Sequence, residues 1–319
     1  MNTKMSLVGY TGFVGSNIYS TGHIDYVYNS KNIINAFGTS PDYLIYSGLR
    51  AEKYIANKFP EKDFDSVLNA INNIKQINPH RLVLISTIDV YDRPKDVYED
   101  TEIKISHLAP YGKNRLYFEN WVENNFSEYL IVRLPGLFGE NIKKNFIYDF
   151  INKIPRLLTS DKLSELKNIN QEISNYYFLN EDGFYQCKEL TSFEYVSLLH
   201  LLDELNFSAL NFTDSRGIYQ FYNLKNLYDD IQTALKNGIK KLNLATEPIN
   251  IGELHEYITN QPFVNEFATS IPHYDFKSHY SKYFNNHHEY LYDKKTIMSE
   301  IATFILDQQK RKGLDYYDK

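Results

Sequence analysis

Three evenly spaced glycines near the N-terminus constrain this chain more than any other feature of its sequence. An apolar run ends at Val8, and Gly9, Gly12 and Gly15 follow it. This spacing predicts a strand that turns sharply into a helix over residues 13–19. Gly9 permits the tight turn, Gly12 lets a pyrophosphate approach the backbone, and Gly15 lets the helix pack on its strand. The pattern predicts a dinucleotide site, and a glycine-rich turn without a ligand is the alternative.

Other residues of the predicted cofactor site lie in this turn and after the next strand. The turn and the start of its helix contribute Thr11, Phe13 and Val14. After a strand predicted over residues 25–28 comes Asn29-Ser30-Lys31, with no acidic residue to hold the ribose hydroxyls of NAD. Ser30 and Lys31 favour the 2'-phosphate of NADP, with NAD as the second choice. A solvated turn is an equally natural explanation of these residue types.

Apolar strands alternate with amphipathic helices through the first 140 residues. Strands are predicted over residues 25–28, 42–48 and 82–87, and a fifth strand with its exit loop over 129–139. Helices are predicted over residues 13–19 and 63–78, and another opens near residue 109. This alternation predicts right-handed crossovers and an α/β fold with a doubly wound parallel sheet.

Composition excludes several classes of partner. The formal charge of −6 at pH 7 gives no electrostatic reason to bind nucleic acid or an anionic membrane. No run approaches the length of a membrane span and no signal-peptide region is seen, so a cytoplasmic protein is expected. Cys187 is the only cysteine, which excludes an intrachain disulfide. His287 and His288 are adjacent and lack partners at ligand spacing, so no metal site is predicted.

Four anchors in a fixed order resemble the extended short-chain dehydrogenase/reductase family, which includes nucleotide-sugar epimerases, dehydratases and reductases. They are Gly9-x-x-Gly12-x-x-Gly15, Ser47-Gly48, Ser86-Thr87 before Val90-Tyr91, and Tyr111 followed by Arg133-Leu-Pro-Gly136. A weaker fifth anchor is Leu242-Asn-Leu-Ala245. The resemblance implies a Rossmann-type dinucleotide-binding domain over residues 1–140 and about 215–250, with Ser47 and Gly48 against the cofactor. It also implies a smaller C-terminal substrate domain over about 141–214 and 251–319.

The resemblance further implies a catalytic set. Thr87 matches the Ser/Thr that hydrogen-bonds the reacting oxygen, and Tyr111 matches the general acid/base. The family has a lysine four residues after this tyrosine, which lowers the tyrosine pKa and reaches the nicotinamide ribose, and here that position is Arg115. An arginine supplies the charge without the compact geometry of an ammonium group. An active site with Arg115 in the lysine's role and a site without turnover are both compatible with this exchange.

The second half of the chain carries fewer motifs. Residues 157–211 are predicted to be irregular, and helices are expected over 224–236, from 251 onward and over 294–309. Arg216 lies roughly where related enzymes hold the substrate pyrophosphate, a task that suits a guanidinium, and a surface arginine in a turn is the alternative. Relatives pair through the helices equivalent to residues 63–78 and 116–126, so the resemblance implies a homodimer. Burial within a single chain explains the same apolar stripes.

Two functions are compatible with these features. The first is an NADP-linked oxidoreductase or epimerase of a nucleotide-activated sugar, with keto-sugar reduction favoured over epimerisation. Hydride would pass between the nicotinamide and a sugar carbon, Tyr111 would move the proton, Thr87 would hold the oxygen and Arg115 would orient the cofactor ribose. The second is a dinucleotide-binding regulator or scaffold that has the fold without turnover. Arg115 favours the second function, whereas Thr87 and Tyr111 favour the first.

Overall fold

The computed structural model describes residues 4–284 and 288–311. The chain forms two compact units, each assembled from segments that are separated in sequence. The first unit runs to Ile142 and adds Ile218–Asn250 and Pro272–Ile301. The second comprises Lys143–Gly217, Ile251–Ile271 and the chain from Ala302 onward.

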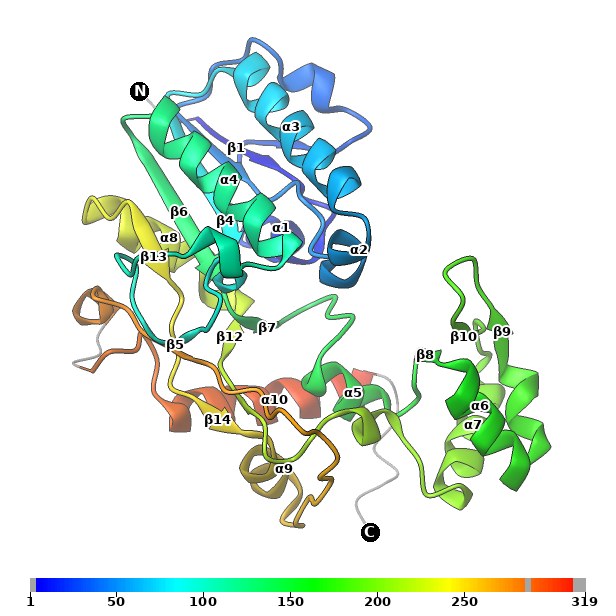
Figure 1. Ribbon diagram of the computed structural model, residues 1–319. Coiled ribbons are helices and arrows are strands. Elements are labelled where there is room, and N and C mark those ends of the chain that lie inside the picture. The colour runs from blue at the N-terminus through cyan, green and yellow to red at the C-terminus, as the bar shows by residue number, and fades with distance from the viewer. Residues whose placement is uncertain (1–3, 285–287, 312–319) are drawn as a thin grey trace. The chain divides into compact units, whose positions relative to one another are not determined.

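A six-stranded parallel sheet forms the centre of the first unit (Figure 1). In spatial order its strands are β13 (Lys241–Asn243), β6 (Tyr129–Leu134), β4 (Arg81–Thr87), β3 (Tyr43–Tyr46), β1 (Met5–Val8) and β2 (Tyr26–Tyr28). The order reverses at β1, which has β2 on one side and β3 on the other. Ligands of open α/β sheets bind outside the carboxyl ends of the strands at such a switch point. The predicted α/β fold with a doubly wound parallel sheet is confirmed.

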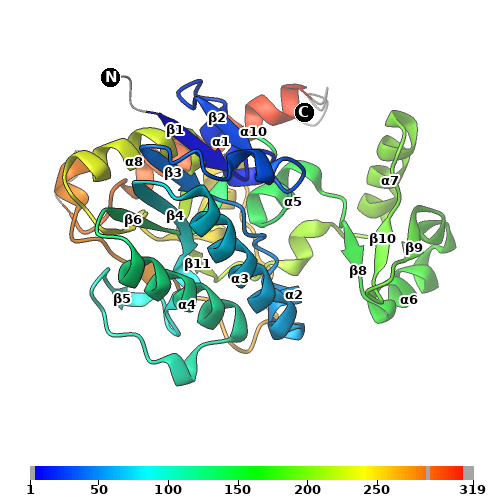
Figure 2. The same ribbon diagram turned by 90° about the horizontal axis from the view of Figure 1, so that it is seen from above.

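Helices cover both faces of this sheet (Figures 1 and 2). On one face α3 (Pro60–Ile77) and α4 (Pro110–Asn125) pack over strand residues that include Leu82. On the other face α1 (Phe13–Tyr19) and α8 (Leu227–Lys236) pack over strand residues that include Val83. Leu82 and Val83 are consecutive in β4 and enter different cores, because successive side chains of a strand point to opposite faces. The sheet is therefore buried on both sides.

Short elements complete the first unit. They are η1 (Ile33–Ala36), α2 (Lys53–Lys58), η2 (Ile88–Val90), β5 (Lys95–Val97), η3 (Ile105–His107), β7 (Gly136–Phe138), β11 (Ile218–Tyr219), β12 (Phe221–Asn223), η6 (Leu224–Asn226), β14 (Ile249–Asn250), β15 (Asp275–Phe276) and η7 (Ser281–Phe284). The short strands among them form three two-stranded sheets: β7 with β12, β11 with β14, and β5 with β15.

Residues 272–301 group with the first unit, although the sequence pattern assigns them to the second region. The reason is that β15 pairs in parallel with β5, and Phe276 is fully buried in the same core as β1. Glu99 strengthens this attachment, since its carboxylate accepts hydrogen bonds from the Ser278 hydroxyl at 2.5 Å and from the Asn243 amide N–H at 2.9 Å.

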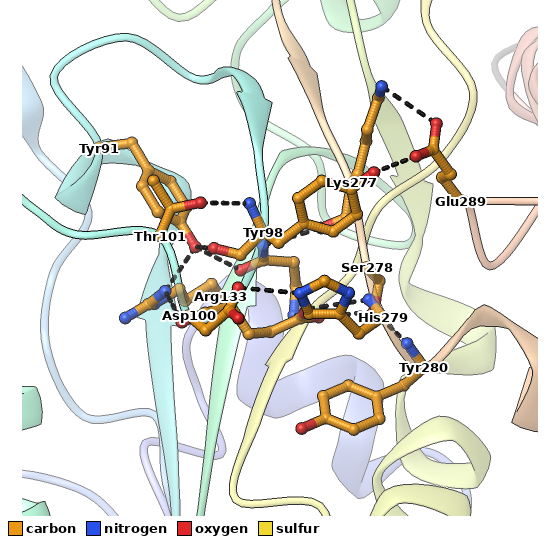
Figure 3. A network of polar contacts seen from close by, with 12 residues as sticks. Tyr91, Tyr98, Asp100, Thr101, Arg133, Lys277, Ser278, His279, Tyr280 and Glu289 are labelled. Atoms are coloured by element: carbon orange, nitrogen blue, oxygen red, sulfur yellow. Dashed lines mark hydrogen bonds and ion pairs between the residues drawn. The ribbon is translucent and has the colours of Figure 1, made fainter.

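A network of polar contacts extends outward from this attachment (Figure 3). The ring of His279 stacks on that of Tyr98 with centroids 4.3 Å apart, and its Nε2 lies 2.8 Å from Asp100 Oδ1. The Tyr98 hydroxyl donates to Glu289, which also pairs with Lys277 at 3.0 Å. Residues near position 98 thus contact residues about 180 positions later in the chain.

The second unit contains more regular structure than its sequence pattern suggests. Its elements are α5 (Phe146–Asn152), β8 (Leu157–Leu158), α6 (Ser160–Ile169), η4 (Gln171–Tyr176), β9 (Tyr177–Leu179), β10 (Tyr185–Cys187), α7 (Ser192–Glu204), η5 (Ala209–Phe212) and α9 (Ile251–Thr259), and α10 (Lys294–Arg311) crosses the boundary between the units. The prediction that residues 157–211 are irregular was wrong. Thr191 and Glu194 form a capping box at the start of α7, a signal that is visible in the sequence as Thr-x-x-Glu.

The described part of the chain was searched for membrane-spanning helices and for clusters of metal-binding side chains. Within residues 4–284 and 288–311, no helix is both long and apolar enough to span a membrane. In the same residues no three His, Cys, Asp or Glu side chains gather in a way that could hold a metal ion. His287 of the adjacent histidine pair lies outside the described residues.

Candidate functional site

The turns after β1, β2 and β3 meet at the carboxyl edge of the sheet. The Gly9 N–H donates to the Tyr28 carbonyl at 2.8 Å, which ties the end of β1 to the end of β2. The Ser47 N–H donates to the Val8 carbonyl at 2.9 Å, and the Ser47 hydroxyl donates to the same oxygen at 3.0 Å. The glycine turn and Ser47-Gly48 are therefore neighbours at the switch point of the sheet.

The three positions of the turn require glycine for different structural reasons. Gly9 has a φ of +95°, and a Cβ there would lie 2.6 Å from the Ser47 carbonyl oxygen. A Cβ on Gly15 would lie 2.1 Å from the Gly9 carbonyl oxygen. Gly12 is exposed, and its Cβ would meet nothing closer than the Gly9 oxygen at 3.3 Å. Packing thus requires Gly9 and Gly15, whereas at Gly12 a Cβ would meet only the Gly9 carbonyl oxygen, and this exposed backbone fits the approach of a phosphate.

The remaining residues of the predicted cofactor site differ in exposure. Thr11 is exposed, whereas Phe13 and Val14 pack partly against the core below α1. In the turn after β2, Asn29 Oδ1 accepts the Lys31 N–H at 2.9 Å, and the side chains of Ser30 and Lys31 are exposed. This hydrogen bond holds the backbone of the turn at Lys31, at the carboxyl end of β2.

Thr87 ends β4 beside the same edge. Its hydroxyl accepts the Asp89 N–H at 3.2 Å and so caps the short helix η2. The hydroxyl hydrogen has only a long contact to Asp89 Oδ2, at 3.5 Å. A threonine in this arrangement keeps a donor that can turn toward another acceptor.

Tyr111 lies in the first turn of α4 and is 5 % exposed. Its backbone N–H donates to Asn57 Oδ1 at 3.0 Å, which connects α4 to α2. The next residue, Gly112, allows close packing on η2, because a Cβ there would lie 2.0 Å from the Asp89 carbonyl oxygen. Thr87 and Tyr111 consequently both adjoin Asp89.

Arg115 is engaged by an acidic partner. Its two terminal nitrogens bond to the two carboxylate oxygens of Asp63 at 3.0 and 2.9 Å, and one of them also donates to the Arg50 carbonyl at 3.0 Å. The side chain is 5 % exposed, and Cζ lies 4.5 Å from the centroid of the Tyr111 ring. Arg115 therefore stands where the sequence predicts, one helical turn after Tyr111, with its charge largely balanced by Asp63.

The pKa of Tyr111 is raised above its ordinary value. Burial is the largest cause, because it disfavours the charged phenolate. The positive charge of Arg115 and a hydrogen bond from it act in the opposite direction, whereas the charges of Asp89 and Asp63 raise the pKa further. The expectation that a cation at position 115 lowers this pKa holds for its direct effect only, since burial and the two carboxylates outweigh it.

Arg216 belongs to the second unit and is also paired. Its guanidinium bonds to both carboxylate oxygens of Asp214, at 2.9 and 2.8 Å, and to the Ala268 carbonyl at 3.0 Å. Glu266 lies 3.5 Å away. A substrate phosphate would have to compete with two carboxylates here, so the geometry does not favour Arg216 as a phosphate ligand.

Lys53 is a charged neighbour of the site that the sequence pattern did not indicate. Its Nζ lies 2.6 Å from Asp89 Oδ1. It comes from α2, a six-residue helix with no motif and no clear apolar periodicity in its sequence. Only the folded chain brings Lys53 beside Asp89.

Comparison with known proteins finds a family model that is similar to part of the chain. Residues 24–172 match the model of the NAD dependent epimerase/dehydratase family. The match begins after the glycine turn and includes Thr87, Tyr111 and Arg115. It confirms the resemblance to the extended short-chain dehydrogenase/reductase family over this range. A comparison with curated proteins gives no match.

Solved structures share the fold of nearly the whole chain. WbmG from Bordetella bronchiseptica, in complex with NAD and UDP, has 14% identity and a TM-score of 0.62, covering 96% of this chain and 94% of that one. RMD from Pseudomonas aeruginosa, complexed with NADPH, has 13% identity and a TM-score of 0.60, covering 97% and 100%. The dTDP-4-dehydrorhamnose reductase from Bacillus anthracis, in complex with NADP, has 15% identity and a TM-score of 0.60, covering 96% and 99%. At these identities the similarity shows the fold alone.

Proposed function

We propose that this protein is an NAD(P)-dependent enzyme acting on a nucleotide-activated sugar, and specifically a reductase of a keto-sugar. The observation that carries the proposal is the meeting of four sequence anchors at one edge of the sheet. The glycine turn, Ser47-Gly48, Thr87 and Tyr111 follow β1, β3 and β4 or begin the helix packed beside them. The family match over residues 24–172 and the ligands named for the similar structures support the same assignment.

The glycine turn fits a dinucleotide. The backbone is exposed at Gly12, where a side chain would obstruct a pyrophosphate, and Gly12 precedes the first turn of α1 without a side-chain cap. Thr11, Phe13 and Val14 would flank the phosphates, and Ser47 and Gly48 would lie against the cofactor from the end of β3. When bound, the dinucleotide would supply the hydride-transfer chemistry that no side chain can provide.

The preference for NADP rests on the turn after β2. Ser30 and Lys31 are exposed there, and residues 29–32 contain no carboxylate. A lysine ammonium attracts a 2'-phosphate, whereas an acidic residue would be needed to hold two ribose hydroxyls. We therefore propose NADP as the preferred cofactor, with NAD as the second choice.

Tyr111 is the proposed proton donor to the reacting oxygen. Its raised pKa keeps the phenol protonated around neutral pH, which suits reduction of a carbonyl, because the oxygen that forms must receive a proton. The Thr87 hydroxyl caps η2 through its lone pair and keeps its hydrogen for the same substrate oxygen. Epimerisation also requires proton removal at an alcohol, for which a protonated phenol is less suited.

The second unit is the proposed substrate region, and a homodimer is the proposed assembly. On α3 and α4, Leu68 is 42% exposed and Tyr117 is 46% exposed, and the rings of Phe64 and Tyr117 are in contact with centroids 5.0 Å apart. These apolar side chains lie on the two helices through which the family resemblance implies pairing. We propose that they form the contact between two copies of the chain.

A second candidate function is a dinucleotide-binding regulator without turnover. The ion pair of Arg115 with Asp63 favours it, since the cation beside Tyr111 is already balanced by a carboxylate. A regulator would bind the dinucleotide and remain unaffected by the loss of the Tyr111 hydroxyl.

The first test is calorimetry of NADP(H) and NAD(H) binding to the full chain. We expect tighter binding of NADP(H), weakened in Lys31→Ala and unchanged in Lys236→Ala, an exposed lysine of α8. Turnover is then assayed with keto-sugar nucleotides. Failure of both dinucleotides to bind would mean that the glycine turn is structural and that the enzyme assignment must be abandoned.

A further inference from the structure

Two side chains of α2 reach the start of α4 and its surroundings. Asn57 Oδ1 accepts the backbone N–H of Tyr111 at 3.0 Å. Lys53, one helical turn earlier, places Nζ 2.6 Å from Asp89 Oδ1. Residues four apart in a helix share a face. One face of α2 therefore presents an amide to the backbone of Tyr111 and an ammonium group to the carboxylate beside it.

Asp89 is coupled to Tyr111 by close packing. Gly112, the residue after Tyr111, leaves room for the Asp89 carbonyl oxygen, and a Cβ there would lie 2.0 Å from it. The negative charge of Asp89 raises the pKa of Tyr111, in addition to the effect of burial. Lys53 interacts with the same groups: although burial lowers its pKa, Asp89, Tyr274 and Tyr111 raise it on balance.

The charges around Tyr111 come from four elements. They are Arg115 on α4, Asp63 on α3, Asp89 on η2 and Lys53 on α2, with the phenol of Tyr274 as a further titratable neighbour of Lys53. Arg115 and Asp63 form a bidentate pair, in which Arg115 lowers the pKa of Tyr111 and Asp63 raises it. Asp89 and Lys53 form the second pair. Lys53 is therefore the direct counter-charge of the second carboxylate that acts on Tyr111.

We infer that Lys53 is a positioning residue for Tyr111: its ammonium group balances Asp89 and thereby allows the phenol to exchange its proton with a substrate oxygen. A buried phenol beside an unpaired carboxylate would hold its proton too tightly, because a second negative charge nearby is costly. The inference rests on the proposed function insofar as Tyr111 moves a proton in catalysis. The Lys53 side chain is 49% exposed, so solvent and salt screen its charge and the effect is moderate.

The test measures the ionisation of Tyr111 directly. Fluorotyrosine is incorporated only at position 111 of the full chain, and its pKa is followed by fluorine NMR at low ionic strength. Lys53→Met is expected to raise this pKa by about one pH unit. Lys53→Arg retains the charge and is expected to restore the pKa of the parent protein. Lys58→Met is the matched control on the same helix, because Lys58 lies over the rings of Tyr54 and Phe59.

The outcomes separate this inference from the proposed function. An unchanged pKa at position 111 in Lys53→Met, or an equal change in Lys58→Met, overturns the role of Lys53 even if NADP(H) binds. A second preparation carries fluorotyrosine only at position 274. If Lys53→Met changes the pKa at position 274 and not at position 111, the inference is overturned as well, because Lys53 then acts on the other phenol. The expected change at position 111, in a protein that binds no dinucleotide, upholds the electrostatic coupling and overturns only the proposed function. Circular dichroism checks that each variant is folded.

In an active enzyme the same variants give a second readout. Loss of the charge at position 53 is expected to displace the pH profile of kcat in the direction of the pKa change, with little change in KM for the dinucleotide. Lys53→Arg is expected to restore the profile. A fall in kcat with an unaltered pH profile would indicate a role in local structure only and would overturn the inference.

Discussion

The guanidinium of Arg115 lies over the ring of Tyr111, with Cζ 4.5 Å from the ring centroid, while its terminal nitrogens bond to both carboxylate oxygens of Asp63. The arginine thus packs against the tyrosine and holds it in place, but it brings a counter-charge with it. An ammonium group could not make this planar, bidentate contact. Burial nevertheless raises the pKa of this phenol, and the charge of Arg115 offsets only part of that effect.

Removal of the Tyr111 hydroxyl tests the enzyme assignment. Tyr111→Phe is expected to reduce turnover by about 100-fold or more, because proton transfer by a positioned group contributes at least that factor. Dinucleotide binding, measured by calorimetry, should remain within about twofold, since the ring and its contact with Arg115 are retained. Tyr117→Phe is the control, because Tyr117 lies on the same helix and is 46% exposed. Turnover in Tyr111→Phe equal to that in Tyr117→Phe would remove Tyr111 from the chemistry, whereas dinucleotide binding without turnover in the parent protein would support the regulator.

Gly12 and Gly15 should respond differently to alanine. Gly12 has φ −80° and ψ 169°, which alanine adopts readily, and its Cβ would lie 3.3 Å from the Gly9 carbonyl oxygen, a contact that a small shift relieves. Gly12→Ala should therefore lower the melting temperature far less than Gly15→Ala does, and should weaken NADP(H) binding by about tenfold or more. Gly15→Ala should destabilise the protein itself, because its Cβ would lie 2.1 Å from the Gly9 carbonyl oxygen. Unimpaired binding in Gly12→Ala would contradict a pyrophosphate at this turn.

The buried ion pair between Glu119 and Arg133 is expected to contribute to the stability of the fold. Both side chains are 1% exposed, with a shortest distance of 2.7 Å, and the Ser86 hydroxyl donates to the same carboxylate at 2.5 Å. Glu119→Gln leaves a buried guanidinium unbalanced and is expected to lower the free energy of unfolding by about 3 to 5 kcal/mol.

The matched control for this pair is on the same helix. Glu123 pairs with Lys241 at 2.5 Å, but the two side chains are 27% and 31% exposed. Glu123→Gln should cost less than about 1 kcal/mol, as partly solvated pairs do. Urea unfolding of both variants gives the comparison, and similar losses would show that burial does not determine the strength of the pair.

The raised pKa of Asp230 predicts that part of the free energy of unfolding decreases as pH rises. Burial raises its pKa to about 6, although the Tyr222 and Tyr292 hydroxyls donate to its carboxylate. In the unfolded chain an aspartate has a pKa of about 3.9, so between about pH 4 and pH 6 the folded state binds more protons than the unfolded state. Stability must then fall with rising pH across this window, by up to about 3 kcal/mol.

Asparagine at this position should remove that component. Asp230→Asn is expected to reduce the pH dependence of the free energy of unfolding between pH 4 and pH 6, measured by urea titration at several pH values. Asp229→Asn is the control, since Asp229 is adjacent and exposed. Identical pH dependence in the parent protein and Asp230→Asn would contradict the raised pKa.

The proposed dimer contact predicts a change in assembly. Leu68→Lys places a charge within the exposed apolar face of α3 and should convert a dimer to a monomer in sedimentation experiments. Ile34→Lys is the control, because Ile34 is 74% exposed and lies on η1 rather than on α3 or α4. A parent protein that sediments as a monomer would contradict the proposed dimer.

The parallel sheet could be predicted because its determinants are local. Gly9 and Gly15 are required by contacts with neighbours a few residues or one strand away, and such contacts leave a spacing that is visible in the sequence. The candidates Thr87 and Tyr111 came from the family resemblance, which assigns them by their place among the anchors. The structure places them beside the same residue, Asp89, which no sequence pattern could specify.

The remaining features depend on distant partners. Asp63 takes up the charge of Arg115 from another helix, and Lys53 reaches Asp89 from a helix without periodicity. The resemblance implies that residues 251–319 belong to the substrate region, whereas the pairing of β15 with β5 joins residues 272–301 to the first unit. Residues 157–211 differ, since α7 begins at a capping box formed by Thr191 and Glu194, which is a local signal distinct from apolar periodicity.

The late return of the chain to the first unit has a consequence for biosynthesis. Ribosomes deliver the N-terminal segments first, yet β5 obtains its partner strand, and the core receives Phe276, only after residues 272–301 have emerged. Part of the apolar surface of the sheet and the Glu99 carboxylate therefore stay uncovered while residues 251–271 of the second unit are translated. A nascent chain in this state is prone to aggregate, so its yield in the cell should depend on chaperone capacity during translation more than on the stability of the finished fold.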